Sequence, residues 1–397
     1  MTRVGRAARL AIRGARSLWL FAGICLLALV ALDRLAMLWV DARERRDSLW
    51  RLQAEAYRDE PWAREVWLEF PRISFQWEPF AYYRASPFAG RFHNVDDEGR
   101  RRTWNRAPAD PSAIDVWVFG GSTAWGFGER DDGTIPSALS RLLADAGWSV
   151  RVENRAQIGY VSTQEVIALQ RALLGSRAPR VVIFYDGFND VLSLLRNDRA
   201  GLSLDESGRA NAFELDGHTL RLARALERHS GLDRLFRYAP PPQTGGAIDP
   251  DRLEKLLPQL VDVYAANVRL VEDAGRAAGF TPIFFWQPTL HSPKKLESPW
   301  ERKMAAFEQG FTKALHERAH HAVCDDRRLA SNPHFHDLDA AFAAADAPLF
   351  VDRAHLNQAG NTLVARRILD DVVPVLQSLQ KKIERHVDSA DPRSSSQ

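Results

Sequence analysis

Residues 114–128 read IDVWVFGGSTAWGFG, a run of β-forming side chains that breaks at two glycines and then presents Ser122. The run 114–119 has the continuous apolar character of a buried strand. A strand that ends in a glycine turn and exposes one serine is a common way to hold a nucleophile at a sheet edge. An ordinary strand followed by a Ser/Thr helix cap would explain the same residues. The rest of the chain decides between the two interpretations.

The sequence around this stretch alternates strands with helices. We expect further strands at 150–153, 180–185, 281–286 and 349–351, and helices at 134–146, 163–174, 251–278 and 358–377. A glycine follows three of these helices, as it commonly does at helix ends. The βαβα order predicts an α/β fold, a three-layer α/β/α domain with a parallel sheet covered on both faces.

Two long insertions interrupt this alternation, at 192–250 and 288–348, within a main domain that we place at 111–380. They contain expected helices around 220–238 and 300–321, and insertions at strand ends often cover a site. Residues 41–110 are rich in Trp and Arg. We expect a helix over 41–57 and then irregular structure packed on the main domain, in preference to a sugar-binding groove. Residues 381–397 form a polar tail.

The N-terminal region predicts a membrane anchor. The basic segment 1–17 contains five arginines, and the first acidic residue is Asp33. The span 18–40 is apolar except for Asp33 and Arg34, and a bilayer-crossing helix needs roughly 20 such residues. Trp19 and Trp39 lie near its ends, where aromatic side chains meet the membrane surface. The arginines indicate a single-pass protein with a cytoplasmic N-terminus and an exported main domain, which in a bacterium would lie on the periplasmic or extracellular side of the inner membrane.

Two alternatives to an uncleaved anchor are open. A cleaved signal peptide lacks a clean A-x-A site here, and Ile24 stands where a lipoprotein signal has a small residue before Cys25. The Asp33-Arg34 pair weakens the anchor, because charges are costly inside a membrane. A buried amphipathic helix is the second alternative, and the five arginines followed by the uncharged run 18–32 argue against it. The formal net charge of +2 gives no sign of nucleic-acid binding. Cys25 lies in the apolar span and Cys324 lies in the main domain, so the two cysteines cannot form a disulfide within one domain.

Candidate site residues follow four of the expected strands: Ser122, Gly159, the run 186–190 and the run 352–355. The carboxyl ends of parallel strands meet at one edge of a sheet, where ligands bind. A serine needs a base to act as a nucleophile, and His355 is the best placed of the 11 histidines. Asp352 would hold the His355 tautomer that leaves its other nitrogen facing Ser122.

Acyl transfer also needs donors for the oxyanion. The backbone N–H of Ser122, the backbone N–H of Gly159 and the side-chain amide of Asn189 are the candidates. Taken singly, Gly159 and Asn189 are equally explained as a turn glycine and an Asx turn.

The combination resembles the SGNH (GDSL-like) hydrolase superfamily, whose four sequence blocks centre on Ser, Gly, Asn and His. The corresponding segments are FGGST (119–123), NRAQIG (154–159), GFND (187–190) and DRAHL (352–356). The resemblance covers residues 114–376 and implies an SGNH/flavodoxin-like fold. It implies Ser122 as nucleophile, His355 as base and Asp352 as the orienting acid. It implies an oxyanion hole built from Ser122, Gly159 and Asn189.

Gly121 departs from the family pattern, which has Asp at this position. The FGGST form resembles a branch of membrane-anchored bacterial members, some of them associated with exported polysaccharides. NVDDEGRR (94–101), FHDLDAAF (335–342) and FVDRAHLN (350–357) are similar to that branch. The G-x-S-x-G elbow of α/β-hydrolases is excluded, because Ala124 replaces its last glycine.

The other candidate sites are weaker. His334, His336 and Asp337 resemble metal ligands, but such residues on one short loop more often pack or cap. His320 and His321 sit at a helix end, where positive charge is favourable. The GGSTAWGFG segment lacks the G-K-[ST] ending of a phosphate loop. We therefore predict neither a metal nor another cofactor, and the sequence indicates no oligomeric state.

The function we expect is a membrane-anchored serine esterase that acts on O-acyl groups, most plausibly acetyl, of an exported or surface glycan. An O-acetyltransferase would use the same acyl-serine intermediate with a sugar hydroxyl in place of water. A lysophospholipase-type lipid esterase and a noncatalytic glycan-assembly protein on the same scaffold are further alternatives. The complete set of Ser, Gly, Asn and His blocks argues against the noncatalytic alternative.

Overall fold

The computed structural model describes residues 3–108, 110–175, 177–210, 230–231, 250–294, 297–307 and 311–390. Residues 1–50 and 211–246 form one compact unit, and residues 51–210 and 247–397 form a second. The helix expected around 220–238 lies outside the described residues, apart from 230–231.

The first unit contains helix α1 (Arg3–Leu49). Among the described residues, the stretch Gly14–Arg43 is the one helical segment long and apolar enough to cross a membrane, with a mean hydropathy of 2.1. Its large apolar side chains are exposed to solvent in this unit, as Trp19 and Leu27 illustrate. By length and composition α1 is suited to be a membrane anchor or a signal sequence.

The helix predicted over 41–57 ends earlier than expected. Helix α1 stops at Leu49, and two short 3₁₀ helices follow, η1 (Trp50–Gln53) and η2 (Glu55–Tyr57). Ala54 between them adopts an extended conformation, with φ −65° and ψ 129°. This break turns the chain so that Tyr57 is buried in the second unit.

The second unit is built on a five-stranded sheet in the order β6-β5-β7-β8-β9, and all its pairings are parallel. The strands are β5 (Ile114–Gly120), β6 (Val150–Asn154), β7 (Val181–Asp186), β8 (Thr281–Trp286) and β9 (Phe335–Asp337). Numbered along the chain the order is 2-1-3-4-5, the flavodoxin-like order of doubly wound sheets. The predicted fold class is confirmed.

The position of the last strand was predicted wrongly. Residues 349–351 form no strand, and Phe350 makes an isolated antiparallel bridge to Leu356. This segment folds back on itself, because the Val351 N–H donates to the carbonyl of His355 at 2.9 Å. The fifth strand is β9, which lies within the expected insertion 288–348 and pairs with residues 284–286 of β8.

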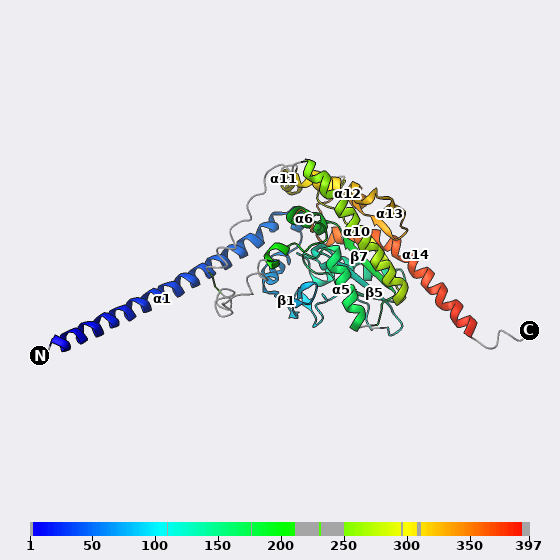
Figure 1. Cartoon of the computed structure of the whole chain (residues 1–397). Helices are drawn as coiled ribbons and strands as arrows, with labels where there is room; N and C mark the ends of the chain where they lie inside the picture. Colours follow the sequence, from blue (N-terminus) through cyan, green and yellow to red (C-terminus); the bar gives the residue numbers. More distant parts are fainter. Residues whose placement is uncertain are drawn as a thin grey trace, which may run out of the picture. The chain divides into compact units, whose positions relative to one another are not determined.

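Helices cover both faces of the sheet, because residues of the strands alternate between two apolar cores. One core joins Val116, Val118, Ile183 and Phe285 to helices α4 (Ile135–Asp145) and α14 (Gln358–Ala390). The other joins Trp117, Phe119, Phe184 and Phe284 to α5 (Ser162–Gly175), α10 (Pro250–Ala278) and α12 (Phe311–Cys324). Figure 1 shows α10 and α12 on this second face.

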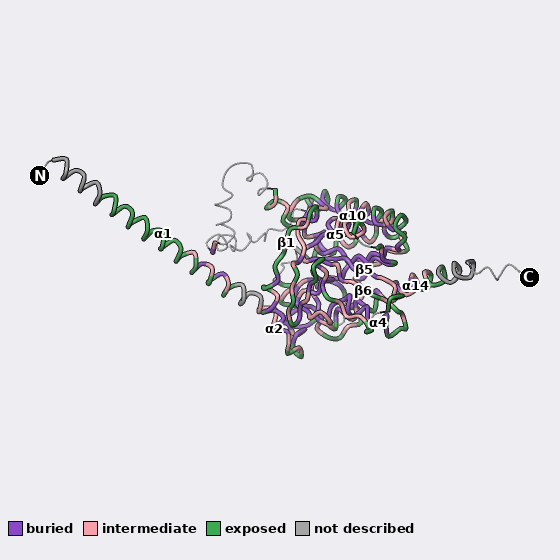
Figure 2. Tube along the Cα trace, turned by 90° about the horizontal axis from the view of Figure 1, so that it is seen from below, coloured by how far each residue is buried: buried purple, intermediate pink, exposed green. Residues whose placement is uncertain are grey.

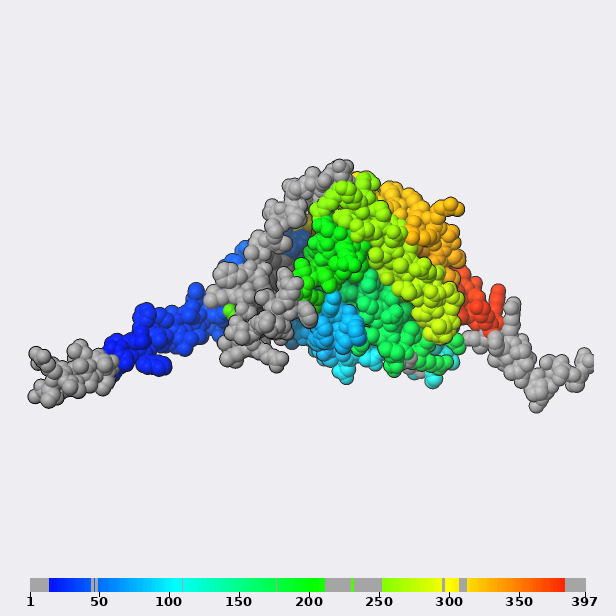
Figure 3. Space-filling view, in the orientation of Figure 1, coloured from blue at the N-terminus to red at the C-terminus, as the bar shows by residue number. Residues whose placement is uncertain are grey.

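Figure 2 shows the buried strands β5 and β6 between α5 and α10 on one side and α4 and α14 on the other. In the space-filling view, α10 lies at the outer surface of its layer beside α5 (Figure 3). The expected helix at 300–321 corresponds to α11 (Pro299–Phe307) and α12. Helix α13 (Arg327–Ala330) and the 3₁₀ helix η5 (Asp339–Phe342) flank β9.

Residues 51–108 contain regular structure as well as loops. Helix α2 (Ala63–Glu69) precedes two antiparallel pairs, β1 (Phe75–Glu78) with β2 (Tyr82–Ala85) and β3 (Phe88–Ala89) with β4 (Asn94–Val95). Trp67 of α2 is fully buried, with its ring centroid 5.0 Å from that of Phe127. This region therefore packs directly against the loop that follows β5.

Candidate active site

The candidate site lies where the connections of the sheet reverse direction, between β5 and β7. In doubly wound sheets the crevice at this point, beyond the carboxyl ends of the strands, is the usual ligand site. Ser122 follows β5 as the first residue of α3 (Ser122–Trp125). Gly187 follows β7 and caps α6 (Phe188–Asn197). Gly120 has φ +156°, and a Cβ there would lie 2.7 Å from the Ala124 Cβ, so the turn into α3 requires glycine.

Ser122, His355 and Asp352 form a continuous chain of hydrogen bonds. Ser122 Oγ lies 2.7 Å from His355 Nε2, and His355 Nδ1 lies 2.8 Å from Asp352 Oδ1. With the proton on Nδ1, the ring donates to the carboxylate and its Nε2 lone pair accepts the serine hydroxyl. The structure thus brings together three residues that the sequence places 233 and 3 positions apart.

The Asp352 carboxylate is held by several donors. Its Oδ1 accepts the backbone N–H groups of Ala354 at 3.1 Å and His355 at 3.0 Å. Burial alone would raise the pKa of Asp352, but the charge and hydrogen bond of His355 and the charge of Arg51 bring it well below its usual range. The Asp352 carboxylate is therefore ionised at neutral pH.

Two neighbours of the triad were missed by the sequence analysis. Arg51 Nε donates to Asp352 Oδ2 at 2.8 Å, on the side of the carboxylate away from the backbone donors. The Phe127 ring lies 4.5 Å from the His355 ring, and the Arg51 guanidinium lies 5.2 Å from the Phe127 centroid. Arg51 stands in an arginine-rich region with no motif, so nothing in the local sequence distinguishes it.

The three predicted oxyanion donors lie on the loops after β5, β6 and β7. Ser122 opens a helix, so its N–H has no acceptor within that helix. Gly159 has φ +77°, and a Cβ there would lie 2.8 Å from the Tyr83 hydroxyl. Asn189 Nδ2 donates to the carbonyl of Tyr160 at 2.7 Å, which leaves the second N–H of that amide for a ligand.

Gly121 is explained by the position of Asn189. Gly121 has φ −80°, which every residue type adopts, so the turn itself does not require glycine here. A Cβ at Gly121, however, would overlap Asn189 Nδ2. The missing side chain lets the Asn189 amide approach the backbone beside Ser122.

Arg101 fixes the loop that follows Ser122. Its side chain is fully buried, lies 4.2 Å from the Trp125 ring centroid and pairs with Asp131 at 3.0 Å. Its terminal nitrogens donate to the carbonyls of Trp125, Gly126 and Glu129. A cation at the C-terminal end of α3 is electrostatically favourable there.

Buried carboxyl groups support the end of β7. Glu165 Oε2 and Asp186 Oδ1 are both buried without a donor from the described residues. Burial, followed by the neighbouring carboxyl groups, raises the pKa of Glu165 well above its usual value, and burial raises the pKa of Asp186 to about 7. These directions favour a protonated carboxyl group that joins Glu165 to Asp186, and Asp186 Oδ2 accepts the Tyr264 hydroxyl at 3.1 Å.

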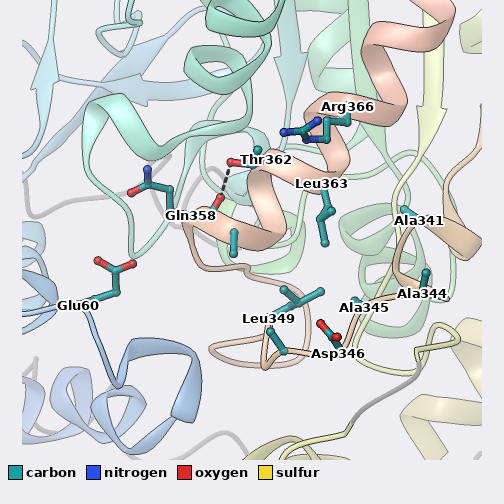
Figure 4. Close-up of a pocket in the computed structure, with 12 residues that line it drawn as sticks. Glu60, Ala341, Ala344, Ala345, Asp346, Leu349, Gln358, Thr362, Leu363 and Arg366 are labelled. Atoms are coloured by element: carbon teal, nitrogen blue, oxygen red, sulfur yellow. Dashed lines mark hydrogen bonds between the residues drawn. The ribbon is translucent and has the colours of Figure 1, made fainter.

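A hollow of about 660 Å³ lies beside the first turns of α14, next to the triad loop in sequence. Figure 4 shows its lining, in which Glu60, Asp346, Gln358 and Arg366 supply polar groups around alanine and leucine side chains. Ser122, His355 and Asn189 are not among its lining residues. The hollow is therefore separate from the triad.

The weaker candidates from the sequence separate in space. His336 and Asp337 are neighbours in β9, so they point to opposite faces. His336 Nδ1 lies 3.3 Å from Asp371, whereas Asp337 accepts a hydrogen bond from His320 at 2.8 Å. Ligand atoms of His320, Cys324 and Asp337 lie within 4.8 Å of one another. The hydrogen bond that His320 donates to Asp337 and the charge of Asp337 raise the pKa of His320, so an ion pair explains why these side chains lie together.

The fold and these hydrogen bonds define an α/β/α domain with a Ser–His–Asp triad at the switch point of its sheet. No protein-family model and no curated protein matches the sequence.

Several solved structures are similar to the chain over about two thirds of its length. They include an acetyl xylan esterase, AlAXEase, with 14% identity, 65% of this chain and 100% of that chain covered and a TM-score of 0.34. TesA has 17% identity, 67% and 99% coverage and a TM-score of 0.34. Est24, a carbohydrate acetylesterase from Sinorhizobium meliloti, has 13% identity, 66% and 99% coverage and a TM-score of 0.37. At TM-scores below 0.5 we base no argument on them.

Proposed function

We propose that this protein is a serine esterase of the SGNH type that hydrolyses O-acyl esters. The observation that carries the proposal is the hydrogen-bonded chain from Ser122 Oγ through His355 to Asp352. This arrangement has the activated nucleophile, the base and the orienting carboxylate that acyl transfer through serine requires. Its position at the switch point of a doubly wound sheet supports the same function.

The residues then act as follows. His355 Nε2 takes the hydroxyl proton as Ser122 Oγ attacks the ester carbonyl carbon. The oxyanion is stabilised by the N–H groups of Ser122 and Gly159 and by the Asn189 amide. His355 returns its proton to the leaving alcohol, which leaves an acyl-serine. Water, deprotonated by His355, then releases the carboxylic acid and restores Ser122.

The proposed setting is the outer side of a bacterial inner membrane, with α1 as an uncleaved anchor. The exposed apolar segment and the arginines that precede it support this orientation. An enzyme held there meets exported glycans, and we propose O-acetyl groups on such a glycan as its substrate. Transfer of the acyl group to a sugar hydroxyl would use the same residues.

The test uses the full-length protein in detergent with p-nitrophenyl acetate and a fluorophosphonate probe. We expect turnover and covalent labelling, and both should disappear in Ser122→Ala. Ser331→Ala is the matched control, because Ser331 is exposed and bonds to the carbonyl of Arg327. Turnover retained in Ser122→Ala would exclude Ser122 as the nucleophile, and its absence from the unaltered protein, together with no labelling, would overturn the proposal.

The acceptor and substrate class are tested in the same preparation. Acetic acid release from acetylated glycans, compared with fatty acid release from phospholipids and lysophospholipids, identifies the acyl donor. Adding a deacetylated glycan then separates the two acceptors. Acetyl groups that appear on the added glycan would show that the enzyme transfers the acyl group to a sugar and does not only hydrolyse the ester.

A further inference from the structure

Arg51 links the chain that follows α1 directly to the triad. Its Nε donates to Asp352 Oδ2 at 2.8 Å, and both side chains are largely shielded, with exposed fractions of 20% and 7%. The guanidinium also lies 4.9 Å from the Trp67 ring centroid and 5.2 Å from that of Phe127. Its planar group is thus held by two rings and one carboxylate, which fixes its orientation.

Residues 51–57, which we call the strap, are fastened to the loops that carry the triad. The Tyr57 hydroxyl donates to the Gly128 carbonyl at 2.8 Å, in the loop that follows Ser122. The Ala56 carbonyl accepts from the Asn357 side chain at 2.9 Å, two residues after His355. A third bond joins the Glu55 carboxylate to the backbone N–H of Trp300 at 3.1 Å. The strap therefore holds the Ser122 loop and the His355 loop against one another.

We propose that Arg51 is a positioning residue of the triad, delivered by the strap, which fixes the orientation and charge of Asp352 during acyl transfer. The inference rests on the proposed function. Arg51 donates to Asp352 Oδ2, so it acts through the carboxylate. It extends the active site to the segment that immediately follows the apolar helix.

Two physical consequences follow from the geometry. Arg51 on Oδ2 and the backbone donors on Oδ1 hold the Asp352 carboxylate in one orientation, in which His355 Nδ1 lies 2.8 Å from Oδ1 and 2.9 Å from Oδ2. The positive charge of Arg51 also opposes the charge that His355 gains when it takes the serine proton. Removing that charge favours the protonated imidazole, so the base becomes active at higher pH.

The other ionisable groups near Asp352 do not obscure this effect. Burial raises the pKa of Tyr57 well above its usual value, with smaller effects from the charges of Glu129 and Asp352. Burial likewise raises the pKa of Glu129 well above its usual value. Both directions favour the neutral form of the two groups. A shift of the acidic limb on mutation of Arg51 therefore reports on Arg51 itself.

The experiment compares Arg51→Lys, Arg51→Gln and Arg51→Ala in the full-length protein in detergent. We expect kcat to fall by up to about 10²-fold in Arg51→Ala, the loss that a misplaced catalytic group causes, with KM nearly unchanged. Arg51→Gln keeps a donor without the charge, so it recovers part of kcat but still shifts the acidic limb of kcat/KM to higher pH. Arg51→Lys keeps the charge and leaves the limb in place.

Arg64→Ala is the matched control, because Arg64 is an exposed arginine of the same region on α2. Thermal unfolding of each variant separates loss of fold from loss of positioning. The inference is overturned if folded Arg51→Ala keeps the wild-type kcat and an unshifted acidic limb of kcat/KM, while Ser122→Ala still abolishes activity. Activity that survives in Ser122→Ala would overturn the proposed function instead.

Discussion

The side-chain amide of Asn189 occupies the space that a Cβ at Gly121 would need. The two residues come from different strand ends, since Gly121 follows β5 and Asn189 follows β7. The same amide donates to the carbonyl of Tyr160 at 2.7 Å, on the loop that follows β6. Three strand ends thus meet around one amide group beside Ser122.

We therefore expect Gly121→Ala to displace the side chain of Asn189. We expect kcat to fall by about 10²- to 10³-fold, the usual cost of losing one oxyanion donor, with little change in KM. The fold should persist, because the backbone at Gly121 suits alanine. Steady-state kinetics and thermal unfolding check both statements. Gly175→Ala is the control, because that glycine has no atom within 4 Å of a built Cβ and no positive φ.

Asn189→Ala tests the same relationship from the other side. If Gly121 acts through Asn189, Gly121→Ala should add little to the loss already present in Asn189→Ala. Effects that multiply in the double variant would show that Gly121 serves another purpose.

A second prediction concerns the buried Arg101. Arg101→Met should lower the free energy of unfolding by about 3–5 kcal/mol, because it leaves Asp131 and three carbonyls without their buried donor. Activity should fall with it, since these carbonyls belong to the loop after Ser122. Denaturant unfolding followed by Trp fluorescence measures the change. Arg102→Met, an exposed neighbour, should stay within about 0.5 kcal/mol of wild type. An equally small effect at Arg101 would contradict the prediction.

Much of the sheet could be predicted because its central strands are apolar on both faces. β7 is buried at every position and β8 at five of six, so each appears as a continuous apolar run in the sequence. β9 has three residues, none of them fully buried, and it is held to β8 by backbone pairing. Backbone hydrogen bonds leave no pattern in the side chains, so the last strand was sought at the apolar segment 349–351 instead.

Part of the candidate site could be predicted from the sequence for a related reason. Ser122 and Asn189 follow strands that the sequence predicts, so topology places them at one edge, and His355 directly precedes the predicted closing helix. Arg51 lies 301 residues from Asp352 and is one of 53 basic residues in the chain. Which cation meets a carboxylate is decided by packing around Trp67 and Phe127. No local pattern encodes that choice.

The third prediction concerns α1. Removing residues 1–40 should transfer the protein from the membrane fraction to the soluble fraction and preserve its kcat, because Arg51 and the strap remain. Ultracentrifugation of lysates, with activity measured in both fractions, checks this. Sedimentation of the shortened protein with membranes would show that the remaining chain binds lipid by itself. A periplasm-dependent reporter fused after Gln397 should be active if the arginines hold the N-terminus in the cytoplasm.

The fourth prediction uses the buried Glu165–Asp186 pair. Both groups have a pKa above their unfolded values in the folded protein, so each binds its proton more tightly when folded. Their favourable contribution is complete below about pH 4, the unfolded range, and is lost as pH rises through the folded values. The contribution of this pair to the unfolding free energy should therefore decline between about pH 4 and pH 8. Glu165→Gln keeps a donor toward Asp186 but has no proton to lose.

The decline should consequently be shallower in Glu165→Gln, which denaturant unfolding at several pH values measures. Glu317→Gln, at an exposed position on α12, should follow the wild-type curve. Parallel curves for Glu165→Gln and the wild type would show that the pair does not hold its proton. Because Asp186 directly precedes the Gly187 turn into α6, loss of that proton at high pH should also disturb Asn189. The alkaline fall in kcat should then move to higher pH in Glu165→Gln, a change that a purely structural role away from the site would not produce.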